Sequence, residues 1–194
     1  MPADPARDPV LQLVAGPNGC GKTTLVTRIL QPVTHLPFVN ADVIAAERWP
    51  HEQAVRAYDA SRAAAHQREL LLATRTSFIT ETVFSHPSKL ALVERAQSLG
   101  YRVELHVVML PEHAAVARVG YRERTGGHHV PEAKIRERYQ RLWPLIARAR
   151  DRAELTYVYD NSRAKRPLRL IARYDHGVLV GKATWPTWTP KSLR

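Results

Sequence analysis

The sequence predicts an α/β fold in which a parallel sheet is covered by helices on both faces. Three observations lead to this prediction. Short apolar segments alternate with longer helical segments along most of the 194 residues, which implies right-handed crossovers between parallel strands. A glycine-rich segment directly follows the first apolar segment. Polar or acidic residues follow the second, third and fifth apolar segments, at the strand ends where open α/β sheets place their functional groups.

The strands are expected where short runs of apolar, β-branched or aromatic residues occur. Five such runs alternate with helical segments, and their expected bounds are 10–15, 36–40, 77–80, 101–110 and 155–159. Two further runs flank His176-Gly177 and are expected to form a C-terminal hairpin, 168–174 and 178–182.

The helices are expected where longer segments rich in helix formers lie between breaker residues. Their expected bounds are 22–30, 52–74, 87–99, 112–124 and 131–150. Pro32 is expected to end the first helix, and Gly100 follows the third. The last two helices are rich in arginine and are interpreted together as a lid, 112–150. The Trp-containing tail, 183–194, is expected to be irregular, packing either on the core or on a partner.

Composition favours one domain spanning 1–194. The apolar fraction of 44% and the charged fraction of 24% are ordinary for a globular chain. No apolar run approaches the roughly 18 residues that cross a bilayer, and the N-terminus lacks the pattern of a signal peptide. Cys20 is the single cysteine, so an intramolecular disulfide is excluded. These features together predict a cytoplasmic protein without membrane contact.

The net charge of +11 is concentrated in the C-terminal half of the chain. Residues 118–169 carry 14 Lys or Arg against 6 Asp or Glu, an excess of eight. One interpretation is a nucleic-acid surface. The other is a set of arginines around a polyphosphate, with the remaining charges on solvated helix faces.

The glycine-rich segment satisfies the pattern G-x-x-x-x-G-K-[ST] from Gly16 to Thr23. In such a loop the backbone N–H groups wrap a phosphate, the lysine reaches the β- and γ-phosphates, and the threonine binds Mg²⁺. Lys22 and Thr23 take these two roles. The predicted cofactors are therefore ATP and Mg²⁺, and a thiol reagent at Cys20 is expected to be slowed by ATP. The predicted cofactor-binding residues of the loop are Gly16, Pro17, Asn18, Gly19, Cys20, Gly21, Lys22, Thr23 and Thr24.

Asp42 and Glu81 are the acidic candidates at strand ends. Asp42 could accept the proton of an acceptor hydroxyl, hold Mg²⁺ through water, or simply cap a helix. Glu81 follows a strand as a Walker B acid does, although Ser77 and Thr80 interrupt the apolar run. It could otherwise bind a substrate hydroxyl or be a surface carboxylate.

Arg118, Arg122 and Arg124 lie on one expected helix, and the first two share a face because they are four residues apart. An arginine beside the transferred phosphoryl group stabilises its spreading charge. The alternative is a solvated helix face.

His128 and Asn161 are weaker candidates. No cysteine or carboxylate completes a zinc set around His128-His129, so a substrate-facing or loop-closing histidine is favoured over a metal ligand. Asn161 follows the fifth strand and could pair with adenine, although asparagine is also common in turns.

Taken in order, these segments resemble the zeta toxin family of P-loop kinases, in particular its shorter bacterial branch. The segments that carry the resemblance span residues 10–165 and are GPNGCGKTT, FVNADVIA, FITETVFSHPSKL, RVGYRERTGGHHVP, IRERYQRLW and YVYDNS. The NAD, ETVFSH and GGHHVP blocks are more specific than the glycine loop, which many P-loop proteins share.

The resemblance implies a P-loop kinase fold and ATP-dependent phosphorylation of a hydroxyl of a UDP-N-acetyl amino sugar. It also implies a toxin that a small helical antitoxin inhibits. Asp42 would be the catalytic base and Lys22, Arg118 and Arg122 would act on the phosphates. Glu81, Thr82 and His128 are assigned to substrate binding.

Two departures from the family pattern leave the acceptor open. Val83 stands where long family members have a threonine, and no clear counterpart of their second clamp arginine is present near GGHHVP. A kinase of another small acceptor, such as a nucleotide, an antibiotic or a cofactor, is therefore the first alternative. A nucleotide-dependent nucleic-acid-binding module is the second, and the absence of helicase motifs disfavours it.

Overall fold

The computed structural model describes residues 8–125 and 130–194 and contains a seven-stranded sheet in the order β2-β3-β1-β4-β5-β6-β7. The strands up to β5 are parallel, whereas β6 and β7 run antiparallel at one edge. The sheet is thus mixed, and its parallel part agrees with the predicted class. The strand bounds are β1 Val10–Ala15, β2 Phe38–Val39, β3 Phe78–Thr82, β4 Arg102–Met109, β5 Leu155–Asp160, β6 Arg169–Asp175 and β7 Val178–Leu179.

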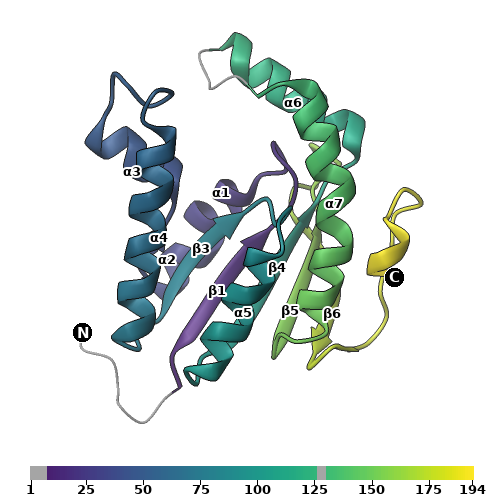
Figure 1. The fold of residues 1–194 in the computed structure, drawn as a ribbon. Helices are drawn as coiled ribbons and strands as arrows, with labels where there is room; N and C mark the ends of the chain where they lie inside the picture. The colour runs from purple at the N-terminus through teal and green to yellow at the C-terminus, as the bar shows by residue number, and fades with distance from the viewer. Residues whose placement is uncertain (1–7, 126–129) are drawn as a thin grey trace.

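Helices cover both faces of the sheet, with α5 and α7 on one face and α1 and α2 on the other (Figure 1). The larger core lies beneath α4, α5 and α7, and the smaller one beneath the helix that follows the glycine loop. The bounds are α1 Lys22–Leu25, η1 Val26–Leu30, α2 Gln31–Thr34, α3 Ala41–Arg48, α4 Ala57–Ala73, α5 Ser88–Ser98, α6 Glu112–Arg124, α7 Glu132–Arg150 and η2 Lys191–Leu193.

The first helix does not end before Pro32 as expected. It continues through the π-helical turn η1 into α2, where Pro32 occupies the first turn. Proline has no N–H to donate, and the π-helical turn directly before it is where the regular α-helical hydrogen bonding is interrupted. The second difference is α3, a helix of eight residues for which the sequence analysis predicted no element.

The C-terminal tail packs on the core. Leu193 is buried, and its carbonyl oxygen accepts hydrogen bonds from Arg150 at 3.1 Å and from Tyr174 at 3.2 Å. Trp185 and Trp188 lie against the same core. Of the two possibilities left open for this segment, packing on the core is the one observed.

The carboxyl ends of the parallel strands meet at one edge of the sheet (Figure 1). The glycine loop follows β1, Asn40 follows β2, Glu81 lies near the end of β3, and Asn161 follows β5. This edge therefore gathers the candidate functional residues, as the crossover rule for α/β sheets predicts.

His106 on β4 is a buried histidine that lies away from this edge. Its ring stacks with Tyr157 and Tyr159 of β5, with ring centroids 5.2 and 6.1 Å away. Burial lowers the pKa of His106 to about 4, below the value of about 6.5 in an unfolded chain. Because the unfolded chain binds the proton more tightly, the folded state loses stability as the pH falls from about 6.5 to 4.

We expect the variant His106→Phe, which keeps an aromatic ring against the two tyrosines, not to lose stability in this way as the pH falls. Relative to the variant, the wild type should lose about 3 kcal/mol of unfolding free energy between pH 7 and pH 4. Urea unfolding of both proteins at several pH values measures the difference. If the unfolding free energies of the two proteins changed with pH in the same way, His106 would bind a proton as readily in the folded protein as in the unfolded chain.

Candidate active site

The glycine loop between β1 and α1 closes tightly against neighbouring strands. Gly16 has φ +152°, and a Cβ atom there would lie 2.3 Å from the carbonyl oxygen of Val108 on β4. Gly21 has φ +96°, and a Cβ atom there would lie 2.7 Å from Nδ2 of Asn161. Only glycine satisfies both the backbone conformation and the space at these positions. The sequence pattern therefore has a direct steric origin.

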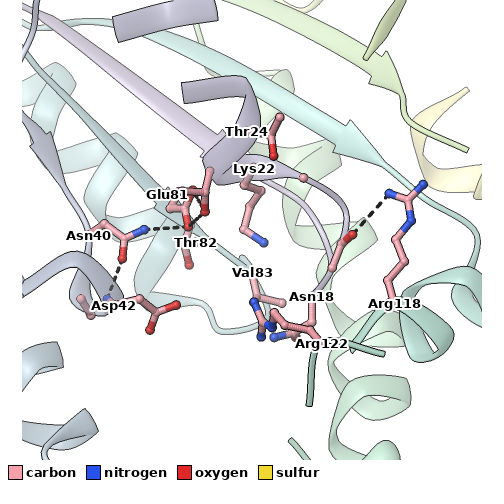
Figure 2. A pocket seen from close by; sticks show the side chains of 14 residues that line it. Asn18, Lys22, Thr24, Asn40, Asp42, Glu81, Thr82, Val83, Arg118 and Arg122 are labelled. Atoms are coloured by element: carbon pink, nitrogen blue, oxygen red, sulfur yellow. Dashed lines mark hydrogen bonds between the residues drawn. The ribbon is translucent and has the colours of Figure 1, made fainter. Parts of the chain in front are cut away.

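Lys22 lies within the curve of the loop. Its ammonium group donates to the carbonyl oxygens of Gly16 at 3.1 Å and Pro17 at 3.0 Å, and the side chain lines the cavity (Figure 2). No acidic side chain in the part of the chain that the structure describes forms an ion pair with Lys22. The positive charge therefore stays available to an anion held by the loop.

Glu81 is the carboxylate nearest the loop. Thr23 Oγ1 donates to both of its oxygens, at 2.9 and 3.1 Å, and Asn40 Nδ2 donates to Oε1 at 2.8 Å (Figure 2). Burial raises the pKa of Glu81 and nearby Asp42 adds to this effect, while Lys22, Thr23 and Asn40 act in the opposite direction. The carboxyl group thus accepts three hydrogen bonds from two neighbours, Thr23 and Asn40, at the junction of the loop, β3 and α3.

Asp42 is the second residue of α3, and it is not the cap of that helix. Asn40 is the cap, because its Oδ1 accepts from the backbone N–H of Asp42 at 2.6 Å and of Val43 at 3.2 Å. The helix-cap interpretation of Asp42 is therefore wrong. Its carboxylate is exposed and lines the same cavity as Lys22 (Figure 2). The interpretations that stay open are acceptance of a proton from an acceptor hydroxyl and binding of Mg²⁺ through water.

Arg118 and Arg122 both line the cavity from α6, but they differ in their contacts. Arg118 donates to the carbonyl oxygens of Gly19 at 3.5 Å and Asn161 at 2.9 Å, so it braces the loop. The guanidinium of Arg122 is exposed, and among the described residues it has no recorded hydrogen-bond or ion-pair partner. Arg124 does not line the cavity.

Asn161 is buried and ties β5 to the loop. Its Nδ2 donates to the carbonyl oxygen of Cys20 at 2.7 Å, and its Oδ1 accepts from the backbone N–H of Leu168 at 3.1 Å. Both ends of the amide are therefore engaged in holding backbone, which gives Asn161 a positioning role. Contact between Asn161 and adenine stays a prediction.

Cys20 lies beneath the loop and is completely buried. Burial also raises the pKa of its thiol. A reagent that needs an accessible thiolate will not report on the loop. The expectation of a thiol group shielded by ATP is therefore wrong, because the fold itself shields it.

A cavity of about 490 Å³ brings most of these residues together, a size that suits small-molecule ligands. Gly16, Pro17, Cys20 and Asn161 shape the loop from outside the cavity, and His128 lies outside the described residues. Asn40 is the polar residue that the sequence analysis missed, although its place before a helix is a capping signal. The lining residues are Asn18, Gly19, Gly21, Lys22, Thr23, Thr24, Asn40, Ala41, Asp42, Glu81, Thr82, Val83, Arg118 and Arg122.

The predicted lid is only partly separate from the core. Residues of α7 from Tyr139 to Ala149 contribute buried side chains to the main core, whereas α6 carries the two cavity arginines. A mobile lid stays a prediction, because α6 also contributes buried side chains, those of Ala115 and Val119.

Comparison with known families identifies the fold. A family model described as an AAA domain matches residues 11–145, which includes the glycine loop and every described cavity residue. The chain belongs to this AAA domain family. No protein of curated function matches its sequence significantly.

Solved structures resemble this AAA domain protein at low sequence identity. The AvrRxo1-ORF1:-ORF2 complex with ATP matches with a TM-score of 0.68 and 15% identity over 90% of this chain, which spans only 61% of the matched chain. The PezAT toxin-antitoxin system of Streptococcus pneumoniae matches with a TM-score of 0.62 and 15% identity, covering 84% of this chain and 72% of the other. A gluconokinase from Sinorhizobium meliloti 1021 matches with a TM-score of 0.51 and 21% identity, covering 84% and 86%. The fold is accordingly that of P-loop kinases, as predicted.

The helices of the described residues give no sign of a membrane span. None of them combines the length and the apolar character that crossing a bilayer requires.

Proposed function

We propose that this AAA domain protein is an ATP-dependent kinase of a small molecule. The observation that carries the proposal is one cavity with two chemically distinct sides. The glycine loop, Lys22 and Thr23 form a phosphate-binding side, and Asp42 on α3 faces the same cavity with an exposed carboxylate. A carboxylate beside a phosphate cradle is suited to accept the proton of an attacking hydroxyl.

The contacts of the arginines assign them different roles in this proposal. Arg118 already donates to two backbone carbonyl groups, so it supports the loop. Arg122 is exposed at the cavity and would contact the transferred phosphoryl group. Stabilising charge on the equatorial oxygens is the main task of such an arginine.

The residues also fit the Mg²⁺ ion that accompanies ATP. Thr23 Oγ1 and the Glu81 carboxylate lie within 3.1 Å of each other at the end of the loop, and Mg²⁺ favours a few protein oxygens together with phosphate oxygens. When bound, the ion would neutralise charge on the β- and γ-phosphates. Thr23 is its proposed protein ligand.

The proposed acceptor is a hydroxyl of a UDP-N-acetyl amino sugar, and the proposed biological role is that of a toxin. The family resemblance supports this, and so does the structural similarity to PezAT, a toxin-antitoxin system. A small helical antitoxin would be the partner, since AvrRxo1-ORF1 was solved as a complex with AvrRxo1-ORF2 and PezAT is a toxin-antitoxin system. A cytoplasmic location follows from such a substrate.

Incubation of the protein with ATP, Mg²⁺ and UDP-N-acetylglucosamine tests the acceptor. We expect mass spectrometry of the nucleotide fraction to show a product 80 Da heavier, formed only with all three components. ATP binding without any product from several UDP-sugars would defeat this acceptor and leave the kinase proposal standing.

Val83 supports another small acceptor as the second candidate. It lines the cavity where long members of the resembled family have a threonine, so the pocket offers one hydroxyl fewer. A screen of cell-extract metabolites with γ-labelled ATP discriminates the two candidates.

A nucleic-acid partner has less support. Several arginines of the basic C-terminal half are in ion pairs, including Arg136 with Glu112 and Glu132, and Arg141 with Glu137. Paired surface charges leave fewer free cations for phosphate contacts along a duplex.

A further inference from the structure

Two cations lie close to each other between α4 and α5, and we call them the α4–α5 cation pair. They are Arg68 of α4 and Lys89 in the first turn of α5, and both side chains are half-buried. Burial lowers the pKa of Lys89, and the nearby charge of Arg68 lowers it further. Within the part of the chain that the structure describes, neither cation forms a hydrogen bond or an ion pair. The two positive charges therefore stand together with no acidic side chain bound to either.

Arg68 stands at a position of α4 that otherwise faces the core. Ala60, Ala64 and Leu72 belong to the same series at intervals of four residues, and all three are buried. Residues four apart lie on one side of a helix. Burial lowers the pKa of Arg68, and a charged group in such surroundings is normally paired. An apolar residue would pack there without this cost, so packing does not explain the arginine.

The acidic residue nearest to Arg68 in the sequence is engaged elsewhere. The charge of Glu69 opposes the effect of burial on Arg68, but the ion pair of Glu69 is with Arg95 of α5, at 3.1 Å. Arg75, just after α4, donates to the carbonyl oxygen of Leu99 at the end of α5. These contacts join the C-terminal parts of the two helices, and the cation pair lies on their N-terminal side.

The N-terminal ends of α4 and α5 lie at the edge of the sheet that holds the active-site cavity (Figure 1). The helix α4 leads to the start of β3, and α5 begins after the end of β3, so both N-termini are at this edge. Helical side chains lean toward the N-terminus of their helix. Val83, which lines the cavity, is six residues before Lys89, and α3 with Asp42 packs against α4. The cation pair is therefore directed toward the side of the cavity where Asp42 lies.

The charge of the α4–α5 cation pair indicates an anionic ligand. Like charges that are partly withdrawn from water repel each other and have lost hydration. An anion between them would offset both effects. Arginine binds phosphate through two parallel hydrogen bonds, and lysine binds it as a point charge. A phosphate group is therefore the ligand chemistry that this pair fits.

We propose that Arg68 and Lys89 bind a phosphate group of the acceptor, so that the enzyme acts on a phosphorylated acceptor and not on a neutral one. The inference rests on the proposed function, because it takes the Asp42 side of the cavity as the acceptor side. The acceptor would lie with its hydroxyl at Asp42 and its phosphate toward α4 and α5. A UDP-sugar or another nucleotide meets this requirement, whereas a neutral sugar does not.

The test uses UDP as the probe and uridine as its counterpart without phosphate. The glycine loop is first filled with Mg²⁺ and adenylyl imidodiphosphate, an ATP analogue that does not transfer its phosphate, so that neither probe binds there. Calorimetry then gives both dissociation constants. For the wild type we expect UDP to bind at least about tenfold more tightly than uridine, because charge-assisted hydrogen bonds to phosphate form. In Arg68→Met and in Lys89→Met this ratio should fall below about threefold.

Matched variants separate the charge from packing. Arg62→Met removes an exposed cation of α4 outside the active-site cavity and should keep the wild-type ratio. Lys89→Arg keeps the charge and should keep the ratio within about threefold. Melting temperatures of Arg68→Met and Lys89→Met should equal or exceed that of the wild type, because removing one of two like charges relieves their repulsion.

Each outcome decides one question. An unchanged ratio in Arg68→Met or Lys89→Met overturns the inference, as does a wild type that binds UDP no more tightly than uridine or binds neither. Displacement of UDP by an equal concentration of inorganic phosphate would indicate a site for the free ion and would also overturn it. A wild type that fails to bind adenylyl imidodiphosphate with Mg²⁺ overturns the proposed function itself.

Discussion

Replacing Lys22 with alanine is expected to abolish ATP turnover. The ammonium group is the positive charge within the curve of the loop, and it donates hydrogen bonds only to two backbone carbonyl groups, those of Gly16 and Pro17. Removing a group that stabilises charge in phosphoryl transfer lowers the rate by roughly a hundredfold to a thousandfold. We expect a loss of at least this size in the release of ADP, measured by a coupled assay, and a loss of growth arrest on induced expression if the protein is a toxin.

Two variants make the interpretation specific to Lys22. Lys22→Met keeps the length of the side chain and should lose turnover like Lys22→Ala, which separates the charge from packing in the loop. Lys182→Ala removes an exposed lysine outside the cavity and should behave like the wild type. Turnover in Lys22→Met within threefold of the wild type would contradict the assignment of Lys22.

The glycine loop was predictable because its constraints are local. Positions 16 and 21 have backbone conformations and close contacts that only glycine allows. The motif therefore contains glycine at both positions. The bounds of α6 were also predicted correctly at both ends, since Pro111 precedes it and a glycine pair follows it. The antiparallel hairpin after β5 was predicted from its turn residues, and it makes the sheet mixed.

Tertiary contacts account for what could not be predicted. The burial of Cys20 depends on β4 and α6, which lie about 90 residues away along the chain. The contacts that separate Arg118 from Arg122 depend on the loop and on Asn161, whereas the sequence shows only two arginines on one helical face. The helix α3 is short, and its sequence has little amphipathic pattern, so Asn40 was its strongest signal.

Replacing Asp42 with asparagine is expected to uncouple nucleotide binding from phosphoryl transfer. The side chain lines the same cavity as the loop, on a helix whose cap is Asn40, so Asp42→Asn preserves both the cap and the size of the residue. Loss of a general base lowers the rate by roughly a hundredfold to ten-thousandfold. We expect transfer to the acceptor to fall by this amount, while the affinity for adenylyl imidodiphosphate with Mg²⁺ stays within about threefold of the wild type.

Reduced transfer together with unchanged affinity for the nucleotide analogue distinguishes the roles that the position of Asp42 allows. If Asp42 held the cation through water, Asp42→Asn would reduce the tightening of nucleotide binding by Mg²⁺. If it only repelled phosphates, its removal would strengthen binding and leave transfer intact. Glu47→Gln, on the same helix but outside the cavity, serves as the control and should change neither quantity. A large loss of transfer with an unchanged response to Mg²⁺ is the result expected of a base that faces the acceptor, because the proposed protein ligand of the cation is Thr23.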